Sequence, residues 1–276
     1  MDELELLYTQ KQDEMTDYGV PDLARLFLAE VQLPDLIKYL PPSVGTEIAA
    51  CCARKINSSK KCHNSVCPRC STLFRVQLAK NFCHSQHDER LRSAFVTYVP
   101  AGYTAKLGNL TELNQSAIVS KLLSSFAEAW STSKSIILVA GSPDVSYNED
   151  PRNLDRKLTP AQRKQRHEFH VHFHFVIVAE NPELLAQKLK DYVLQRRLPL
   201  KGEFRATACY CTARSILYST KCKPVRRAAT RDKRGNRDRQ TRPLSQKPKA
   251  EAVRWLASAP EDVRFFTFWN QGRTTP

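Results

Sequence analysis

Three histidines alternate with hydrophobic residues in the segment from Glu168 to Ala179. This segment, EFHVHFHFVIVA, is rich in residues that favour β-structure, so the sequence predicts a strand here. Because successive side chains of a strand point to opposite faces, His170, His172 and His174 share one face with Glu168. The other face is uniformly hydrophobic and is predicted to face the core, which leaves the histidines on a polar, non-core face. The residues predicted to face the core are Phe169, Val171, Phe173, Phe175 and Ile177.

Neutral imidazole is the side chain that most often binds a metal in proteins. The spacing therefore predicts that two of these histidines, two residues apart on the strand, clasp one metal ion. A third histidine, such as His170, and Glu168 share their face and are candidates for a third ligand, while Asp144 can reach the ion from the preceding loop. The alternative is a solvated face whose histidines have no ligand, and the spacing alone names neither the metal nor the reaction.

A tyrosine and a lysine follow downstream, three residues apart, near the end of a predicted helix over residues 213–220. Tyr218 and Lys221 would be neighbours on one face of that helix. A tyrosine hydroxyl can act as a nucleophile, and a nearby cation favours its phenolate form. The alternative is an ordinary tyrosine that is half-buried by packing.

Five cysteines lie within 20 residues and form the pattern Cys-Cys-x9-Cys-x4-Cys-Pro-Arg-Cys. A Cys-x-x-Cys pair is typical of the tight half of a tetrahedral zinc site, and two further thiols complete such a site. We therefore expect structural zinc, bound by four of these five, with reduced cysteines that merely cluster as the alternative. The candidate zinc ligands are Cys51, Cys52, Cys62, Cys67 and Cys70.

The formal net charge of +15 favours a polyanionic partner. Residues 223–249 contribute eleven Lys or Arg and two Asp, a net of +9. We expect this basic segment to be mobile and to contact phosphates without reading sequence, or else to be only a solvated linker. No apolar run is long enough to span a membrane and no signal peptide is evident, so we expect a cytoplasmic protein and no membrane partner. The candidate DNA-binding residues are Arg226, Arg227, Arg231, Lys233 and Arg234.

The surrounding pattern indicates an α+β fold with a central antiparallel sheet flanked by helices. Residues 1–48 look helical, partly because Leu23, Leu26, Phe27 and Val31 recur at helical spacing, and residues 144–166 are predicted to form a long loop. Strands are predicted at 93–99, 135–140, 168–179 and 204–209, and helices at 71–92, 110–131, 182–197 and 213–220. The predicted regions are a helical region at 1–50, a cysteine-rich segment with a helix at 51–92, a sheet domain at 93–222, a basic flexible segment at 223–250 and a tail at 251–276.

A His-hydrophobic-His strand followed by a helix and then Tyr-x-x-Lys resembles the HUH endonucleases, and among these the rolling-circle replication initiators of plasmids and phages. The resemblance covers about residues 93–224 and implies an HUH nuclease domain. It implies that His172 and His174 bind catalytic Mg²⁺ or Mn²⁺, that Tyr218 is the nucleophile, and that Lys221 assists it. The expected product is a 5′-phosphotyrosine with a free 3′-OH. The Cys-x4-Cys-Pro-x-Cys pattern also resembles a segment that precedes this domain in some members.

The chain departs from the family pattern in one place, because Arg214 lies where some members have a second nucleophile. Tyr210 is the local candidate for that role. No phosphate-binding P-loop occurs, so an initiator of this kind would use helicase and polymerase of its host to replicate origin DNA. Three alternatives remain: a single-strand transposase, a zinc-dependent DNA-binding regulator without nuclease activity, and a metallohydrolase acting through metal-bound water. The oligomeric state is open.

Overall fold

The computed structural model describes residues 3–20, 22, 33–55, 58–85, 89–100, 102–149, 159, 167–196, 200–221, 224–231, 233–234 and 236–270. The amphipathic stretch predicted around Leu23–Val31 and most of the loop predicted at 144–166 lie outside these residues. Within the described part of the chain, no helix has both the length and the apolar character needed to cross a membrane.

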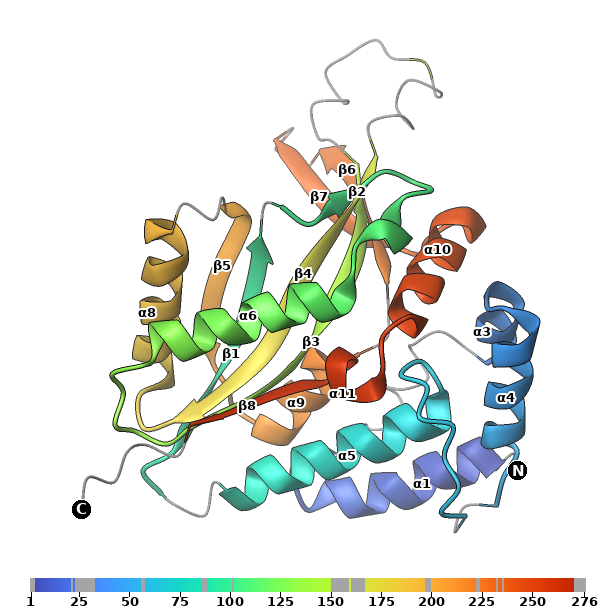
Figure 1. Cartoon of the computed structure of the whole chain (residues 1–276), viewed down its shortest axis with the longest axis horizontal. Coiled ribbons are helices and arrows are strands. Elements are labelled where there is room, and N and C mark those ends of the chain that lie inside the picture. Colours follow the sequence, from blue (N-terminus) through green and yellow to red (C-terminus); the bar gives the residue numbers. More distant parts are fainter. Residues whose placement is uncertain are drawn as a thin grey trace.

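The centre of the fold is an eight-stranded sheet, in which β5, β1, β4, β3, β6 and β7 are neighbours in that order (Figure 1). The short β2 pairs with β4, and β8 pairs with β3. Every pairing is antiparallel except that of β3 with β6. The prediction of a mainly antiparallel sheet flanked by helices is therefore confirmed. The strands are β1 (Arg92–Pro100), β2 (Thr104–Ala105), β3 (Ile137–Asn148), β4 (Glu168–Ala179), β5 (Leu200–Ala208), β6 (Val225–Arg231), β7 (Arg237–Arg242) and β8 (Phe266–Asn270).

Helices cover both faces of the sheet (Figure 1). One face packs against α6 and α8, and the other is covered by α9 and α5, with α1 packed against α5. The α-helices are α1 (Glu3–Thr16), α3 (Leu33–Tyr39), α4 (Pro42–Cys52), α5 (Pro68–Ser85), α6 (Gln115–Ala129), α8 (Pro182–Gln195), α9 (Thr212–Ser219), α10 (Gln246–Ala257) and α11 (Glu261–Arg264), with a 3-10 turn η1 at Leu110–Glu112. The single helix predicted at 110–131 is thus two elements, because Asn114 caps α6 by accepting a hydrogen bond from the Ala117 N–H.

The prediction that the histidines occupy a non-core face is wrong. On β4 the same parity that carries His172 and His174 continues into Val176 and Val178, which are buried under α5 and α9. Both faces of β4 are therefore core faces, and His172 and His174 are buried with them. When helices cover both faces of a sheet, polar side chains on one face are buried as well as the apolar side chains on the other.

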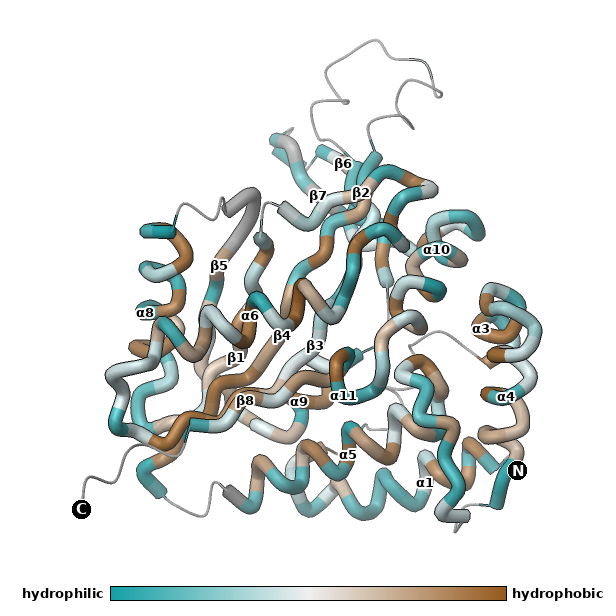
Figure 2. Tube along the Cα trace, viewed as in Figure 1, coloured by the Kyte–Doolittle hydropathy of each residue, from teal (hydrophilic) through white to brown (hydrophobic). Residues whose placement is uncertain are grey.

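Two loop predictions are also wrong. Asp144 lies within β3 rather than in a loop, because β3 runs on to Asn148 beside the long strand β4. The basic segment expected to be flexible at 223–250 forms the hairpin β6–β7 and the start of α10, so the predicted boundary at residue 251 falls inside a helix. Pairing with the end of β3 supplies backbone partners that composition does not reveal. Figure 2 shows that this hairpin is hydrophilic over most of its length, whereas β4 beside β1 is hydrophobic.

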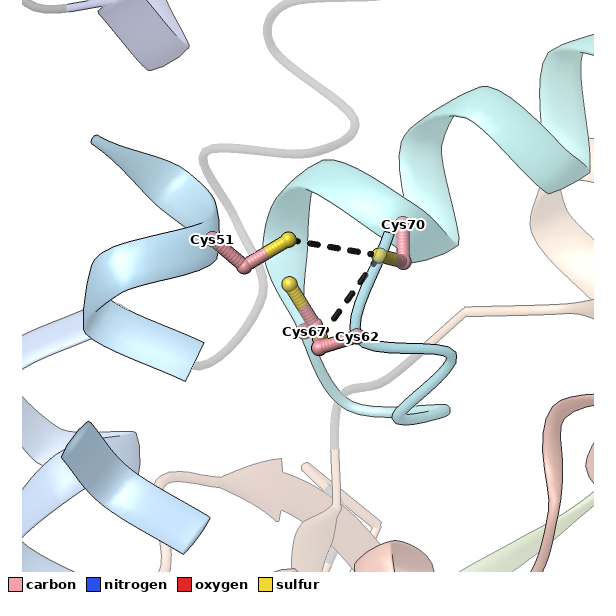
Figure 3. Close-up of side chains that lie close together, drawn as sticks. All are labelled: Cys51, Cys62, Cys67 and Cys70. Carbon is pink, nitrogen blue, oxygen red and sulfur yellow. Dashed lines mark hydrogen bonds between the residues drawn. The ribbon is translucent and has the colours of Figure 1, made fainter. Parts of the chain in front are cut away.

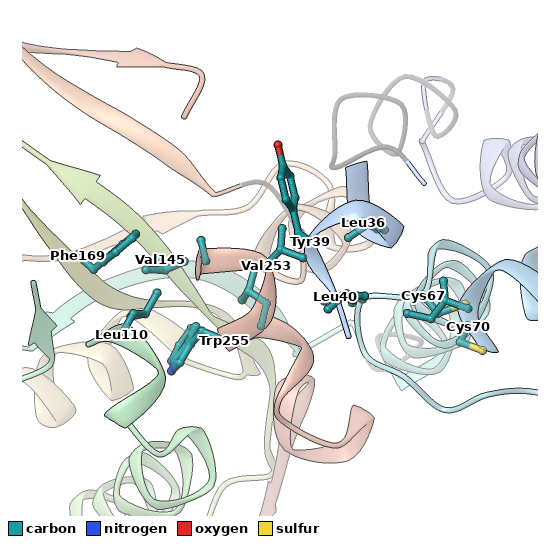
Figure 4. Packing of buried hydrophobic residues seen from close by; sticks show 14 of the residues in the cluster. Leu36, Tyr39, Leu40, Cys67, Cys70, Leu110, Val145, Phe169, Val253 and Trp255 are labelled. Atoms are coloured by element: carbon teal, nitrogen blue, oxygen red, sulfur yellow. The ribbon is translucent and has the colours of Figure 1, made fainter. Parts of the chain in front are cut away.

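A third cluster of buried residues joins the N-terminal helices to the C-terminal part of the chain (Figure 4). Trp255 and Val253 of α10 pack there with Phe169 of β4 and Leu36 of α3. The cysteine-rich segment belongs to the same cluster, through Cys67 and its neighbours. The N-terminal region and the sheet therefore share one core.

Candidate metal centre and adjoining tyrosine

The pairing of β3 with β4 brings an aspartate to the two histidines that the sequence singled out. Asp144 lies directly across from His172 in the antiparallel register, and Ser142 lies across from His174. Asp144 Oδ2 is 3.5 Å from His172 Nε2 and 3.9 Å from His174 Nε2. One ligand atom from each of the three lies within 4.8 Å of the other two, which is close enough to hold one metal ion.

The close approach of these strands depends on Gly141, which pairs with Phe175. A Cβ at Gly141 would lie 2.4 Å from the carbonyl oxygen of His174 and from the Phe175 Cβ. Glycine at this position lets β3 lie against the part of β4 that carries a ligand.

Burial and charge prepare these groups for a cation. Burial alone raises the pKa of Asp144, but the hydrogen bond with His172 and the charge of Lys221 outweigh it and hold that pKa well below its usual range. Burial, with the neighbouring His172, holds the pKa of His174 well below its ordinary value. The centre therefore combines a carboxylate with a neutral imidazole, which are the forms that bind metal.

A threonine on β1 orients one of these imidazoles. Thr97 Oγ1 lies 3.1 Å from His174 Nδ1. When Nδ1 carries the proton it donates to Thr97, and Nε2 then presents its lone pair toward Asp144. Such an outer hydrogen bond fixes the tautomer and the orientation of a ligand imidazole.

The two other candidates for the third ligand lie farther along the same row. His170 Nε2 is 2.9 Å from Glu168 Oε1, and these two residues are not part of the three-residue group with Asp144. Asp144, proposed from the sequence only as a loop residue, is the one that the fold brings to the histidine pair. A lone aspartate inside an otherwise apolar and small-residue run, ILVAGSPDV, is the signal that could have placed it on a strand.

Tyr218 and Lys221 lie beside this centre. The ring of Tyr218 is 6.0 Å from that of His174, centroid to centroid, and its side chain is 45% exposed. Lys221 Nζ lies 4.1 Å from the centre of the Tyr218 ring and 3.7 Å from Asp144 Oδ2. Burial lowers the pKa of Lys221, but Asp144 and Tyr218 outweigh that effect and raise it, so Lys221 stays an ammonium between the tyrosine and the carboxylate.

Side chains from three other elements hold the end of α9 that carries Tyr218. The last carbonyl groups of a helix have no partner within it. Ser142 of β3 donates to the Ser219 carbonyl at 2.8 Å, and Arg75 of α5 donates to the Leu217 carbonyl at 2.6 Å. Arg264 of α11 donates to the Lys221 carbonyl at 2.9 Å. Sequence reasoning missed these residues, because nothing in their spacing relates them to α9.

Tyr210, the candidate for a second nucleophile, is fully exposed and precedes α9, which begins at Thr212. It is thus separated from Tyr218 by the length of α9, about 12 Å at the usual helical rise. Arg214, at the other position considered, pairs with Asp22 at 2.8 Å. Neither residue belongs to the group around Asp144.

The cysteines form a second cluster, between the end of α4 and the start of α5 (Figure 3). Cys70 Sγ lies 3.6 Å from the Sγ atoms of both Cys51 and Cys62, and these three with Cys67 lie within 4.8 Å of one another. A tetrahedral zinc with bonds of about 2.3 Å requires sulfur separations of about 3.8 Å, while a disulfide requires about 2.0 Å. Cys52 Sγ is 3.7 Å from Cys67 Sγ, but Cys52 is outside this group of four.

The acidities of these thiols also fit a bound cation. Hydrogen bonds from Cys62 and Cys67 lower the pKa of Cys70, whereas those with Cys52 and Cys62 raise the pKa of Cys67. Without a cation, one thiolate is therefore stabilised at the expense of another. Arg69 ties the preceding loop to the same turn of α5 by donating to the carbonyl groups of Arg54, Lys55 and Ser58.

The candidate DNA-binding residues are divided between the two faces and the turn of the β6–β7 hairpin. Arg226 binds the carboxylate of Glu149 through two nitrogens. Arg231, Lys233 and Arg234 are exposed at the end of β6 and in the turn. Arg227 pairs with Asn148, at the end of β3, and is half-buried.

No family model matches this chain, and no curated protein or solved structure matches it either. The functional interpretation therefore depends on the residues of two clusters, the Asp144–His172–His174 centre with its neighbours and the group of four cysteines. Both clusters offer ligands that could hold a metal ion.

Proposed function

We propose that this protein is a metal-dependent endonuclease and strand transferase that cuts single-stranded DNA through Tyr218 and rejoins it, in the manner of rolling-circle replication initiators. One observation carries the proposal: an exposed tyrosine lies next to a buried Asp-His-His group, with a partly buried ammonium between them. A tyrosine with only a packing role needs neither a metal-binding group nor a charged lysine at its ring.

The Asp144 centre would suit a catalytic divalent ion such as Mn²⁺ or Mg²⁺, because it includes a carboxylate and supplies only three protein ligands, so such an ion would keep positions for a phosphate. When bound, that ion polarises the scissile phosphate and neutralises its developing charge. Asp144, His172 and His174 hold it, and Thr97 keeps His174 in the required tautomer.

Tyr218 and Lys221 perform the transfer. The ammonium of Lys221 stabilises negative charge on the Tyr218 oxygen as its proton leaves. That oxygen attacks phosphorus, a Tyr218 O–P bond forms and the P–O3′ bond breaks. The departing 3′ oxygen takes up a proton, which leaves a free 3′-OH and a 5′-phosphotyrosine. The reverse reaction, with an incoming 3′-OH, releases Tyr218 and seals a strand.

The four-cysteine cluster has a different role in this proposal. Four thiolates in a closed tetrahedron are typical of structural zinc and leave no open position for a substrate. We assign Cys51, Cys62, Cys67 and Cys70 as its ligands, with Cys52 as a neighbour. The natural substrate would be one strand of origin DNA, and the extension of its 3′-OH would require a helicase and a polymerase from the host.

The proposal is tested by incubating the protein with a library of 5′-labelled and 3′-labelled single-stranded oligonucleotides and Mn²⁺. A covalent adduct is expected on denaturing gels, carrying only the 3′ part of the cut strand, because the tyrosine retains the 5′-phosphate. Tyr218→Phe should form no adduct, whereas Tyr210→Phe, in the exposed residue before α9, should form as much as the wild type. Equal adduct from Tyr218→Phe would refute the assignment.

The same assay separates the alternative functions. A metallohydrolase acting through bound water would keep cleaving after Tyr218→Phe but lose cleavage after His172→Ala. A DNA-binding regulator would bind without cutting at any metal concentration. A transposase would share the adduct but prefer oligonucleotides from element ends over those from a replication origin.

A further inference from the structure

Arg227 lies on the sheet face that carries the metal ligands. It pairs with Asn148 in the parallel register of β3 and β6, and register partners on neighbouring strands point to the same face. Asn148 is four residues from Asp144 along β3, so these two share a face as well. Arg227 therefore belongs to the same side of the sheet as Asp144, His172 and His174.

One nitrogen of the Arg227 guanidinium lacks the hydrogen-bond partner that a buried donor normally has, as far as the described part of the chain shows. This nitrogen, Nε, is buried and makes no hydrogen bond to any residue that the structure describes. The adjacent Arg226, on the opposite face, contrasts with it, because Glu149 accepts from both Nε and Nη2 of Arg226. The remaining oxygen of Glu149 accepts a hydrogen bond from the Ala229 N–H, so both oxygens of this carboxylate already bind groups other than Arg227. A buried donor without a partner is costly, and a ligand that supplies an acceptor removes that cost.

The charge around the centre also favours an anion. On this face Asp144 and Glu168 contribute two negative charges, against the positive charges of Lys221 and Arg227 and the two positive charges of a bound divalent ion. The positive charge of Arg227 is among the charges that act on His174 and Lys221, although Asp144 and Tyr218 outweigh it at Lys221, so its field reaches the metal centre. The centre thus carries an excess of positive charge that a phosphate would balance.

We propose that Arg227 and Lys221 form a phosphate-binding site beside the Asp144–His172–His174 centre, in which Arg227 holds the DNA strand at or next to the scissile phosphate. The planar guanidinium offers two parallel N–H groups to phosphate oxygens, an arrangement that a lysine at the same position cannot reproduce. This inference rests on the proposed function and assigns Arg227 a direct contact with the substrate. The rest of the hairpin then contributes only general attraction to the strand.

Two arms test this role, with Arg231 as the matched control. Arg231 is exposed and lies on the same face of β6 as Arg227, four residues farther along the strand, which corresponds to about 13 Å. In the first arm, single-turnover adduct formation is measured at saturating oligonucleotide and Mn²⁺. Arg227→Gln should lower the rate by about 100-fold, as expected for the loss of one fixed donor in a transition state. Arg227→Lys should recover part of it, and Arg231→Gln, which removes only general attraction to the strand, should lower the rate far less than Arg227→Gln.

In the second arm, binding of the same oligonucleotide is measured by fluorescence anisotropy over a range of salt in a Tyr218→Phe background. Loss of one phosphate contact should reduce the slope of log affinity against log salt by about 0.7 in the Arg227→Gln variant. Its affinity for Mn²⁺ alone should be no weaker than that of the parent, because removing a nearby positive charge does not weaken cation binding. This control distinguishes a lost phosphate contact from a damaged centre.

The outcomes separate the two proposals. If the wild type forms the adduct and Arg227→Gln keeps its rate and salt slope, the phosphate site is refuted and the proposed function stands. If the wild type forms no adduct with any oligonucleotide, the proposed function fails, and the salt slope alone decides whether Arg227 binds phosphate. If Arg227→Gln and Arg231→Gln lower the rate equally, Arg227 has no specific role.

Discussion

At the scale of single residues, the centre is defined by which carboxylate completes the histidine pair. Glu168 and His170 share the strand with His172, but they contact each other. Asp144 comes from another strand and contacts both ligand histidines. A group of three ligands from two neighbouring strands is held rigidly, because the register of the strands fixes all three positions.

Replacing Asp144 should therefore affect metal binding far more than replacing its competitor. Asp144→Ala is expected to weaken Mn²⁺ binding by at least about 100-fold. Loss of a residue that only supports a metal ligand costs up to about 100-fold, and loss of a ligand itself should cost at least as much. His170→Ala, two residues from His172, should change it much less. Isothermal titration of the metal into each variant checks this, and equal losses would show that the third ligand is misassigned.

Thr97 is a positioning residue that acts through His174. Thr97→Val removes the hydroxyl at nearly constant volume and should weaken Mn²⁺ binding by about 10-fold to 100-fold. Thr97→Ser restores the hydroxyl and should restore most of the affinity. If serine did not rescue binding, packing rather than the hydrogen bond would explain the effect of valine.

At the scale of elements, the position of Tyr218 depends on how the last turn of α9 is held. The helix has only eight residues and would be marginal alone. Its end is bound by β3, α5 and α11 through Ser142, Arg75 and Arg264. Tyr218, the proposed nucleophile, is thereby fixed relative to β3, which is the strand that carries Asp144.

Arg75 offers the clearest test of this arrangement. Its side chain is buried and donates to the Leu217 carbonyl and to Thr220 Oγ1. Arg75→Met leaves these groups without that donor and should lower the free energy of unfolding by about 1–3 kcal/mol, with slower adduct formation. The control is Arg214→Ala at the other end of α9, whose exposed pair with Asp22 should contribute about 0–1 kcal/mol. Urea unfolding measures both, and equal effects would contradict the special role of Arg75.

At the scale of the whole molecule, the cysteine cluster joins the N-terminal helices to the sheet. Cys51, Cys67 and Cys70 belong to the same buried cluster as Trp255 of α10 and Phe169 of β4 (Figure 4). A metal at the cysteines would thus stabilise the packing of regions that are far apart in the sequence. In the proposed function the two candidate metal sites have separate tasks, one in stability and one in chemistry.

Removing the cysteine metal should lower the melting temperature of the whole chain. Cys62→Ser, at the least buried of the four ligands, should abolish bound zinc in elemental analysis and reduce thermal stability. Cys83→Ser should keep the zinc, because Cys83 is outside the group, and Asp144→Ala should keep it as well. If Asp144→Ala lost the zinc instead, the assignment of the two metals would be reversed.

The sequence alone determined the elements whose signals are local. Alternation predicted β4 and the shared face of His172 and His174, and the spacing of the cysteines predicted their cluster, because both depend on positions close together in the chain. Only the tertiary structure decided what depends on strand register and on packing between distant segments. The length of β3 and its pairing placed Asp144, helices on the second face buried His172 and His174, and the parallel pairing of β6 placed Arg227 on the sheet face that carries the centre. Periodicity reports which face a side chain occupies, but not what lies across from it.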